Sequence, residues 1–290
     1  MDAASVKPLV SGFYDKPTGA VQYVVADSVT RRCAIIDPVL DFDEKSGATA
    51  TTNADALLDF IAREGLDVEW ILDTHPHADH FSAAHYLKQK TGAPTAIGER
   101  VVDVQKLWKA IYNWPDLPSD GRQWDRLFGE GEVFSIGRLP VKVLFSPGHT
   151  LASITYVVGD AAFVHDTLFM PDSGTARCDF PGGSASRLWG SLQGILALPD
   201  HTRIFVGHDY QAGGREPRWE STVGEQKASN IHLVAARTEA EFVALREARD
   251  RTLPMPRLIL HALQVNINGG RLPEPEANGR RYLKFPLDAL

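Results

Sequence analysis

The sequence predicts a layered α/β fold in which two β-sheets pack face to face and helices cover the outer surfaces. Short apolar and β-branched segments alternate along the chain with segments of helical composition. Two strand-rich stretches occur, and each is followed by helices, which is the order expected for stacked layers. The chain has 290 residues and no linker-like segment, so a single domain is predicted over residues 1–290, with a helical and loop extension from about residue 230.

The first half of the chain is predicted to begin with a β-hairpin and a capped helix. The strands Ala20–Ala26 and Arg32–Ile36 are close enough to pair across a polar turn. The helix is predicted to run from Asn53, as its N-cap, through Arg63. The elements predicted after it are a strand at Val68–Thr74, a helix at Phe81–Lys90, a strand at Pro94–Ile97, a helix at Val101–Tyr112 and a loop at Asn113–Arg126.

The second half is predicted to be richer in strands. Its apolar runs are short and are bounded by Gly, Pro or Asp, as is usual for buried strands. The predicted strands are Glu132–Phe134, Val141–Ser146, Ile154–Val158, Ala161–Val164 and Arg203–Val206. Later helices are predicted within Ser184–Leu198 and Thr222–Arg251.

Composition and charge argue against several classes of partner. A hydrophobic share of 43% is normal for a globular protein with a sizeable core. The net charge of -7, without a basic tract, argues against a nucleic acid or a membrane as partner. Residues Met1–Lys16 lack the apolar stretch of a signal peptide, and no apolar run reaches membrane-spanning length. Cys33 and Cys178 are too few for a disulfide framework, so a reducing, cytoplasmic location is predicted.

The segment Thr74–His80 carries the strongest indication of function. It places the imidazoles of His75, His77 and His80 and the carboxylate of Asp79 just after a predicted strand. Imidazole and carboxylate bind first-row divalent ions, and ligands close in sequence lose little chain entropy when they converge on an ion. Functional sites of layered α/β proteins gather at strand ends, so the location also favours a metal site.

Three later strands end in side chains of the same kind. His149, Asp166 and His208 follow predicted strands directly or after a short turn. Taken alone, a histidine after a strand is more often a hydrogen-bonded structural residue than a metal ligand. Together with the first cluster, these residues predict a metal site. Histidines without this context are interpreted as surface or packing residues: His85, His201, His232 and His261.

The positions of these metal-type residues resemble those of the metallo-β-lactamase superfamily. The residues that carry the resemblance are the run His75-x-His77-x-Asp79-His80, then His149, Asp166 and His208, and the early pair Asp37-Pro38. The resemblance extends from about residue 19 to about residue 230. It implies an αββα four-layer sandwich with its metal site along one edge, and it is much less specific for the reaction.

Two branches of that superfamily act on glutathione derivatives. The segments Asp172–Phe180, Gly207–Tyr210 and Ser221–Gln226 are similar to persulfide dioxygenases, in particular to the bacterial type labelled β-lactamase hydrolase-like. Glyoxalase II enzymes share the first cluster but usually lack the Arg-x-Asp-Phe element that begins here at Arg177. The resemblance therefore favours a non-heme iron enzyme that oxidises glutathione persulfide with O2 to sulfite and glutathione.

The resemblance to persulfide dioxygenases implies one Fe(2+) per chain, held by His75, His149 and Asp166. Two imidazoles and one carboxylate on one face of the ion leave three adjacent positions for substrate and oxygen. The residues implied to hydrogen-bond the ligands, or to bind a second metal, are His77, Asp79, His80 and His208. One alternative is a glyoxalase II-like thioester hydrolase with two Zn(2+). A metal-binding or scaffolding protein without turnover is the other.

Residues outside the ligand set have two interpretations each. Arg177 is the candidate for binding a substrate carboxylate, and a structural salt bridge to Asp179 is the alternative. Tyr210 is the candidate for contacting the substrate or oxygen, and a phenol packed at the sheet edge is the alternative. Tyr210, His208 and Asp79 are the candidate catalytic residues. The resemblance also implies a homo-oligomer, either a dimer or a tetramer.

Two positions depart from the family pattern. His165 stands where relatives commonly have glycine, and Leu151 stands where a proline is frequent. An imidazole directly before Asp166 is expected to shift that ligand, to add a hydrogen-bond donor or to point to the opposite face of the strand.

Overall fold

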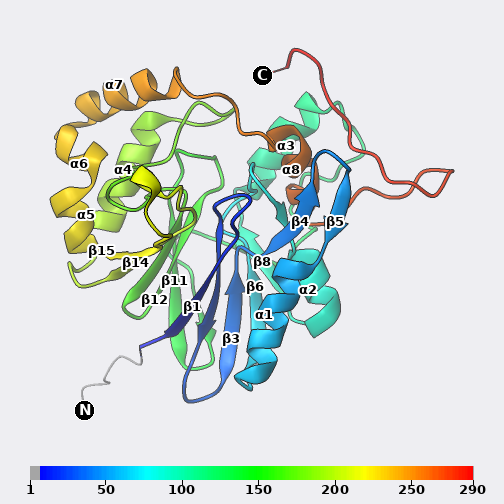
Figure 1. Cartoon of the computed structure of the whole chain (residues 1–290), viewed down its shortest axis with the longest axis horizontal. Helices are drawn as coiled ribbons and strands as arrows, with labels where there is room; N and C mark the ends of the chain where they lie inside the picture. The colour runs from blue at the N-terminus through cyan, green and yellow to red at the C-terminus, as the bar shows by residue number, and fades with distance from the viewer. Residues whose placement is uncertain (1–6, 290) are drawn as a thin grey trace.

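The structure, a computed structural model that describes residues 7–289, contains two β-sheets packed face to face (Figure 1). The first sheet has the strand order β1 (Leu9–Tyr14), β2 (Val21–Ala26), β3 (Arg32–Ile36), β6 (Asp67–Leu72), β8 (Thr95–Gly98) and β9 (Arg126–Phe128). The second has the order β10 (Val133–Ile136), β11 (Leu139–Phe145), β12 (Ile154–Val158), β13 (Ala161–His165), β14 (Arg203–Val206) and β15 (Glu220–Thr222). A smaller sheet has the order β5 (Ala48–Ala50), β4 (Val39–Asp43) and β7 (Phe81–Ser82).

Apolar side chains from both sheets meet in one core. Val25 and Ile36 of the first sheet and Tyr156 of the second are fully buried in the same cluster. The rings of Phe128 in β9 and Phe134 in β10 stack with their centroids 4.3 Å apart, which joins the two sheets directly. The β-branched and aromatic residues that predicted the strands therefore form the layer between the sheets.

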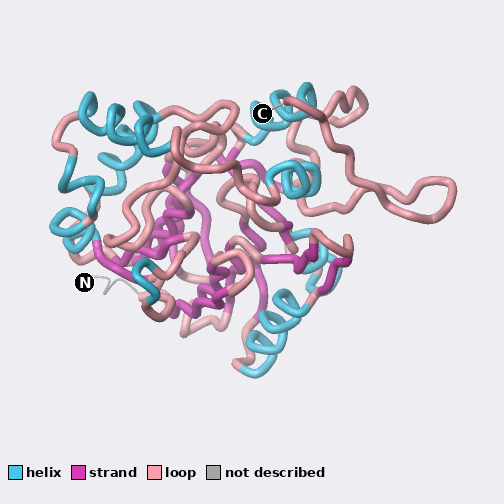
Figure 2. Tube along the Cα trace, turned by 45° about the horizontal axis from the view of Figure 1, so that its top comes forward, coloured by secondary structure: helices cyan, strands magenta, loops and turns pink. Residues whose placement is uncertain are grey.

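Helices cover the outer face of each sheet (Figures 1 and 2). Over the first sheet lie α1 (Thr52–Arg63), α2 (Ala84–Thr91), α3 (Val101–Ile111) and α8 (Ile259–Asn266). Over the second lie α4 (Ala185–Leu196), α5 (Val223–Ser229), α6 (Ile231–Ala235) and α7 (Glu239–Asp250). The buried residues of α1 recur with helical spacing, since Ala54, Leu57 and Ile61 face the sheet. The predicted α/β class, with two sheets between layers of helices, is confirmed.

The prediction that Asn53 caps α1 is wrong. The helix begins at Thr52, and Asn53 lies inside it. The side-chain amide of Asn53 donates to Asp41 (2.7 Å) and to Asp15 (3.1 Å). These partners come from other elements, and the sequence around a helix start does not reveal them. The prediction used only the local sequence, whereas tertiary contacts determine what the side chain of Asn53 binds.

Other differences concern short elements. The helix predicted from Phe81 begins at Ala84, because Phe81–Ser82 pairs with β4 as the strand β7. The helical stretch predicted within Thr222–Arg251 is divided among α5, α6 and α7, and the cap residues Asn230 and Thr238 begin the latter two. The elements that were not predicted are β1, β4, β5, β9, β15, α8 and the short 3-10 helix Ala212–Gly214. Most of these strands are too short to show a period of their own.

The carboxyl ends of four strands come together at one edge of the sandwich. β13 and β14 are parallel, and β11 runs in the same direction because both β11 and β13 are antiparallel to β12. At this edge the N–H of Ile154 donates to the carbonyl of Thr74, two residues beyond the end of β6 (3.1 Å). The N–H of Val21 donates to the carbonyl of Gly207 (2.8 Å). These bonds hold the strand ends of the two sheets beside each other.

Two sequence-based predictions concern parts that the structure does not test. Residues 1–6, which belong to the stretch predicted to lack a signal peptide, lie outside the described residues. The single domain over residues 1–290 also stays a prediction. Within residues 7–289, the helices are too short or too polar to cross a bilayer.

Candidate metal centre

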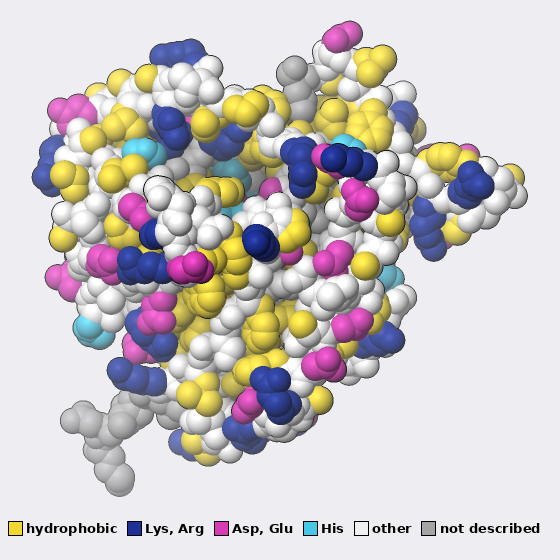
Figure 3. Space-filling model, in the orientation of Figure 1, with side chains coloured by type: hydrophobic (Ala, Val, Ile, Leu, Met, Phe, Trp, Pro, Cys, Tyr) yellow, Lys and Arg dark blue, Asp and Glu magenta, His cyan; other side chains and the backbone are white. Residues whose placement is uncertain are grey.

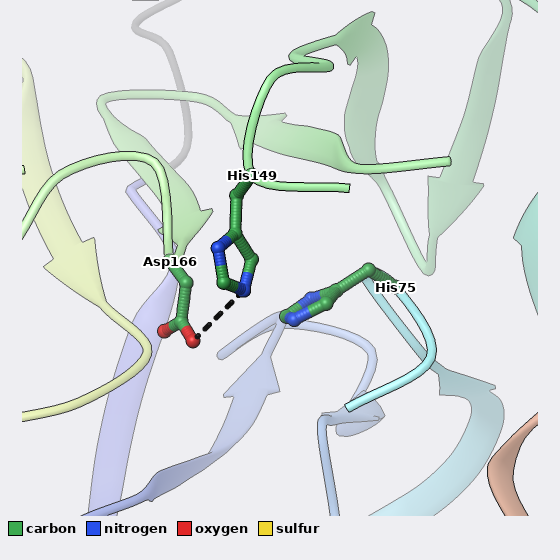
Figure 4. Close-up of side chains that lie close together, drawn as sticks. All are labelled: His75, His149 and Asp166. Carbon is green, nitrogen blue, oxygen red and sulfur yellow. Dashed lines mark ion pairs between the residues drawn. The ribbon is translucent and has the colours of Figure 1, made fainter. Parts of the chain in front are cut away.

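Three side chains from three strand-end loops converge at this edge (Figure 4). His75 lies beyond the end of β6, His149 lies beyond β11, and Asp166 directly follows β13. One ligand atom of each lies within 4.8 Å of the other two. The side chains are buried, with exposed fractions of 1%, 5% and 5%. These three residues, called the ligand trio below, are the ones that the sequence analysis assigned to iron.

Hydrogen bonds assign the tautomers of both histidines in the ligand trio. The hydroxyl of Thr74 donates to Asp37 (2.8 Å), so it accepts from His75 Nδ1 at 3.0 Å. The Nδ1 of His149 lies 2.9 Å from the carbonyl oxygen of Arg177, which can only accept. Both histidines therefore carry their proton on Nδ1 and keep a lone pair on Nε2. Metal-binding histidines are commonly held in this way by a partner at the other ring nitrogen.

The ligand trio has the protonation state that a divalent metal requires. Burial, followed by the neighbouring imidazoles, holds the pKa of His75 well below its ordinary value. Burial also lowers the pKa of His149, although Asp166 opposes this. The Nε2 atom of His75 is buried and has no hydrogen-bond partner among the described residues. A buried polar atom without a partner destabilises a fold, and a bound metal ion would satisfy this one.

Five neighbouring side chains form a second set, called the paired network below: Asp37, His77, Asp79, His80 and His208. His208 lies between two carboxylates, with Nδ1 2.5 Å from Asp166 Oδ1 and Nε2 2.6 Å from Asp79 Oδ2. The same oxygen of Asp79 accepts from His80 Nδ1 at 2.9 Å. Burial alone would lower the pKa of His208, but the charges of Asp166 and Asp79 outweigh it and hold that pKa well above its ordinary value.

Asp37 joins the paired network to the ligand trio. Its carboxylate lies 3.0 Å from His77 Nε2 and accepts from the backbone N–H of Thr74 at 2.7 Å. Burial opposes the charge on His77, but Asp37 outweighs this effect and raises the pKa of His77 to about 9. Thr74 in turn accepts from His75. Through these contacts Asp37 supports the loop that carries His75 and His77.

The geometry also brings together groups that could hold a second metal. The sets His77–Asp79–His80 and Asp79–Asp166–His208 each offer ligand atoms within 4.8 Å of one another. In both sets, however, Asp79 already accepts from two histidines. A second ion bound through that oxygen would have to replace these hydrogen bonds. Nε2 of His80 and both ring nitrogens of His77 are, like Nε2 of His75, buried without a hydrogen-bond partner among the described residues. The residues of the trio fit one metal ion without rearrangement of the network.

A cavity of about 550 Å³ opens beside the ligand trio. Figure 3 shows a hollow in the upper part of the view, with histidine at depth and Lys or Arg side chains around it. His149, Asp166 and Asp79 line its inner end, and Phe169 and Phe180 form apolar walls. The other wall is the segment Leu253–Leu258, which links α7 to α8. A volume of this size suits a small-molecule ligand.

The arginines around the cavity differ in whether their charge is balanced. Arg177 makes two bonds of 2.7 Å to Asp179 and one of 2.6 Å to the carbonyl of Pro254. Arg246 is buried and pairs with Asp250 (2.7 Å). Arg249 is exposed, and its guanidinium has no hydrogen bond or ion pair within residues 7–289. The guanidinium of Arg257 has only a 3.5 Å contact with Glu44. The structure thus contains the salt bridge between Arg177 and Asp179, which was the alternative interpretation of this residue. A contact between Arg177 and a substrate stays a prediction.

Tyr210 lines the cavity next to the paired network. Its ring stacks on that of His208 with centroids 5.6 Å apart and an interplanar angle of 9°. The side chain is 58% exposed, and its hydroxyl has no hydrogen-bond partner among the described residues. Tyr210 can therefore offer a neutral O–H group to a molecule in the cavity.

The remaining sequence-based assignments have mixed outcomes. His85, His201, His232 and His261 belong to none of the metal-type groups within residues 7–289. His232 nevertheless lines the cavity, where its Nδ1 accepts from the N–H of Thr175 (2.9 Å). Leu151 packs in an apolar cluster with Trp108 and Phe180. Burial raises the pKa of the Cys178 thiol, which makes it an inert packing residue.

Comparison with protein families identifies the fold family. The model described as "Metallo-beta-lactamase superfamily" matches residues 16–208, which include every residue of the ligand trio and the paired network. The chain belongs to the metallo-β-lactamase superfamily. The αββα fold class and the resemblance stated from the sequence are confirmed. This superfamily binds metals, and the protein has a cluster of His and Asp side chains at the strand-end edge of the sandwich.

Individual superfamily relatives carry different names. A β-lactamase hydrolase-like protein of Agrobacterium fabrum is 74% identical over 98% of this chain, and the chain spans about 65% of that relative's length. "Glyoxylase B2" of Dictyostelium discoideum is 46% identical over 99% of both chains. The mitochondrial persulfide dioxygenase ETHE1 of Mus musculus is 28% identical over 92% of this chain and 91% of its own. The solved structure of ETHE1 from Myxococcus xanthus has a TM-score of 0.73 and 29% identity, covering 91% of this chain and 100% of that one.

Sequence reasoning missed the part of the site that comes from the C-terminal region. Arg249, Arg257 and the segment Leu253–Leu258 line the cavity although they carry no motif. Thr74, which fixes the tautomer of His75, was treated only as the end of a strand. Its position directly before the first ligand was the available signal. The cavity wall had no such signal, because it depends on how the link between α7 and α8 crosses the strand ends.

Proposed function

We propose that this protein is a persulfide dioxygenase that oxidises glutathione persulfide with O2 at one Fe(II), giving sulfite and glutathione. The proposal assigns the metal to the ligand trio. The observation that carries it is the convergence of buried ligand atoms in the trio, beside which His208 and Asp79 Oδ2 are already engaged in hydrogen bonds. Two histidines and one carboxylate with open positions are the ligand set typical of non-heme Fe(II) oxygenases. The similarity to two ETHE1 proteins supports the same reaction.

Fe(II) held by His75, His149 and Asp166 would supply coordination positions and redox chemistry for the sulfur and the dioxygen. The surrounding residues fix the ligands. Thr74 orients His75, and the carbonyl of Arg177 orients His149. His208 holds Oδ1 of Asp166, so Oδ2 is the oxygen directed toward His149. Such partners of ligands generally change metal affinity or activity by 10–100-fold when they are removed.

The reaction releases protons, and the paired network can accept or deliver them. Glutathione persulfide, O2 and water give glutathione, sulfite and two protons, and the electrons lost by the terminal sulfur reduce the dioxygen. Asp79 lines the cavity and shares the proton on His208 Nε2. Tyr210 presents its O–H beside this pair. We assign Asp79 and His208 to proton handling and Tyr210 to a hydrogen bond with the substrate.

The cavity suits an anionic substrate that has an apolar middle. Its inner end is the ligand trio, and its walls include Phe169 and Phe180. Arg249 and Arg257 lie on the side of α7 and the following link. Glutathione persulfide has carboxylates remote from its sulfur, so the unpaired charge of Arg249, with Arg257 beside it, would attract them. Arg177 borders the same space and is our candidate for a further contact. A homo-oligomer, dimer or tetramer, and a cytoplasmic location stay predictions.

A binuclear zinc hydrolase of a glutathione thioester is the second candidate. The two further groups of ligand-type atoms around Asp79 favour it, as does the relative named "Glyoxylase B2". In that case Asp166 would contact both ions, because it belongs to two of the groups.

Oxygen uptake distinguishes the two candidates. Protein loaded anaerobically with Fe(II) should consume O2 when glutathione persulfide is added and should release sulfite in equal amount. The same protein loaded with Zn(II) should cleave a glutathione thioester only weakly. His149→Ala, which removes one ligand, is the matched control for both assays. Thioester cleavage by the zinc form without O2 uptake by the iron form would reverse the assignment.

A further inference from the structure

His165 adopts a backbone conformation that is unfavourable for its residue type. It is the last residue of β13, and its φ is +42°, in the left-handed region that favours glycine. The pairing of β13 with β14 shifts register between Phe163 and His165, so the strand bulges at this point. Strain of this kind persists where the surrounding structure imposes it, and it is concentrated at functional sites.

The side chain of His165 adds a second unfavourable feature. The imidazole is 2% exposed. Its Nε2 lies 2.8 Å from the hydroxyl of Thr167 and 3.1 Å from that of Ser146, but its buried Nδ1 has no partner within residues 7–289. A glycine at this position would avoid both the strained φ and the unsatisfied nitrogen. Stability of the fold therefore does not explain the histidine.

The contacts of His165 join the three chain segments that carry the ligand trio. Its ring centroid lies 5.0 Å from that of His75. Its hydrogen bond to Ser146 reaches the residue at the start of the turn that presents His149. It directly precedes Asp166 in the chain, and Thr167 anchors the other side of that ligand. One side chain thus lies against His75 and is hydrogen-bonded to the segments that carry His149 and Asp166.

We propose that His165 is a positioning residue that holds the ligand trio at its metal-binding spacing, and that its conformation lowers the stability of the metal-free fold. The imidazole fills the space against His75 and ties the end of β11 to the end of β13. The proposal depends on the ligand trio as the metal site and does not depend on which reaction the metal performs.

Three substitutions separate the strain from the imidazole. His165→Gly removes the imidazole and relieves the positive φ, His165→Ala removes the imidazole and keeps the strain, and His165→Asn keeps a polar group that tolerates this φ. Co(II) titration of the metal-free protein gives the metal dissociation constant, and the absorption spectrum of bound Co(II) reports its coordination. Thermal unfolding of the same metal-free samples gives Tm.

The glycine and alanine variants should lose Co(II) affinity to a similar extent, by roughly tenfold or more. Their Tm values should nevertheless differ, with His165→Gly above His165→Ala by about 2 °C or more, because only glycine relaxes the backbone. His165→Asn should recover part of the lost affinity. The Co(II) spectrum should change in the glycine and alanine variants, since the ligand spacing is no longer held.

His261→Ala is the control for loss of a packed histidine. His261 also has a buried Nδ1 without a partner, but it packs against Phe42 and Phe285 and belongs to none of the described metal-type groups. This variant should change Tm and leave Co(II) affinity within about twofold of the unsubstituted protein, since it removes no contact to a ligand loop. Unchanged Co(II) binding in His165→Gly would overturn the proposal, as would losses of affinity that simply follow Tm across all four variants. Absence of O2 uptake would count against the proposed reaction and leave this inference standing.

Discussion

The ligand trio and the paired network lie at the same edge of the sandwich and consist of the same residue types, but their polar atoms have different partners. In the trio, hydrogen bonds fix each histidine through Nδ1 and leave Nε2 free. In the network, His208 is bonded at both ring nitrogens, and Asp79 accepts from two histidines. The comparison indicates that a histidine or aspartate can either bind the metal or orient a residue that binds it. The hydrogen-bond partners of its nitrogen or oxygen atoms determine which of the two roles it has.

The largest expected effect is the loss of one member of the trio. His149→Ala should abolish bound metal and lower dioxygenase activity by about 1,000-fold or more, because each ligand is needed to hold the ion and set its open positions. Elemental analysis and O2 uptake measure the two quantities. His201→Ala removes an exposed histidine and should change neither. Full metal content in His149→Ala would exclude His149 as a ligand.

A substitution in the paired network should have a smaller effect on metal binding. Asp37→Asn weakens the contacts to Thr74 and His77 without removing a member of the trio. We expect metal affinity to fall by roughly 10–100-fold, in the range typical for residues that orient ligands. Metal titration of the purified variant measures this. A complete loss of metal, equal to that of His149→Ala, would erase the distinction between the two sets.

The unpaired arginine of the cavity provides a test that leaves the metal unchanged. Arg249→Gln should raise KM for glutathione persulfide by about tenfold and keep kcat within about twofold, because a remote cation binds the substrate equally in the ground and transition states. Arg251→Gln removes an exposed arginine two residues further along, at the C-cap of α7, that does not line the cavity. Steady-state O2 uptake compares the two variants. Equal KM values in both would show that Arg249 does not contact the substrate.

The smallest effect is expected at an ion pair outside the site. Asp160 lies 2.8 Å from Arg203 and 3.3 Å from Lys7. Burial alone would raise the pKa of Asp160, but its bonds and ion pairs with Arg203 and Lys7 lower it. A carboxyl with a lowered folded-state pKa stabilises the fold above its unfolded pKa of 3.8, and this contribution is lost as the pH falls below that value.

Asp160→Asn should therefore cost about 0.2–1 kcal/mol at pH 7, with the difference shrinking below about pH 4. Urea unfolding at several pH values measures the free energy of unfolding. Metal affinity should be unchanged, since the pair lies outside both sets of site residues. A fall in metal affinity similar to that of Asp37→Asn would mean that stability in general, and not the network, controls the site.

The sequence predicted the long elements well because their patterns are local. The strands Ile154–Val158 and Arg203–Val206 have the predicted bounds, and α3 differs by one residue at its end. β7 was missed because two residues cannot show a period, and its pairing with β4 is a tertiary contact. Asn53 was assigned as a cap for the related reason that its partners come from distant elements.

The site was predictable to the extent that its residues follow strands. Parallel strand ends meet at one edge, so the positions after β6, β11, β13 and β14 were expected to converge, and they do. The division into trio and network was only implied by the family resemblance. It becomes a physical argument through atoms such as Thr74 Oγ1 and the carbonyl of Arg177, whose positions no spacing rule provides. The strain at His165 was likewise visible only in the backbone.

The number of metal ions per chain tests the central claim most directly. Elemental analysis of active protein, purified without added metal, should find one iron per chain and much less than one zinc. That result would agree with a metal held by the ligand trio alone and with a hydrogen-bonded network beside it. Two metal ions per chain in the active form would contradict the account, because the second ion would have to be bound by residues that we assign to the paired network.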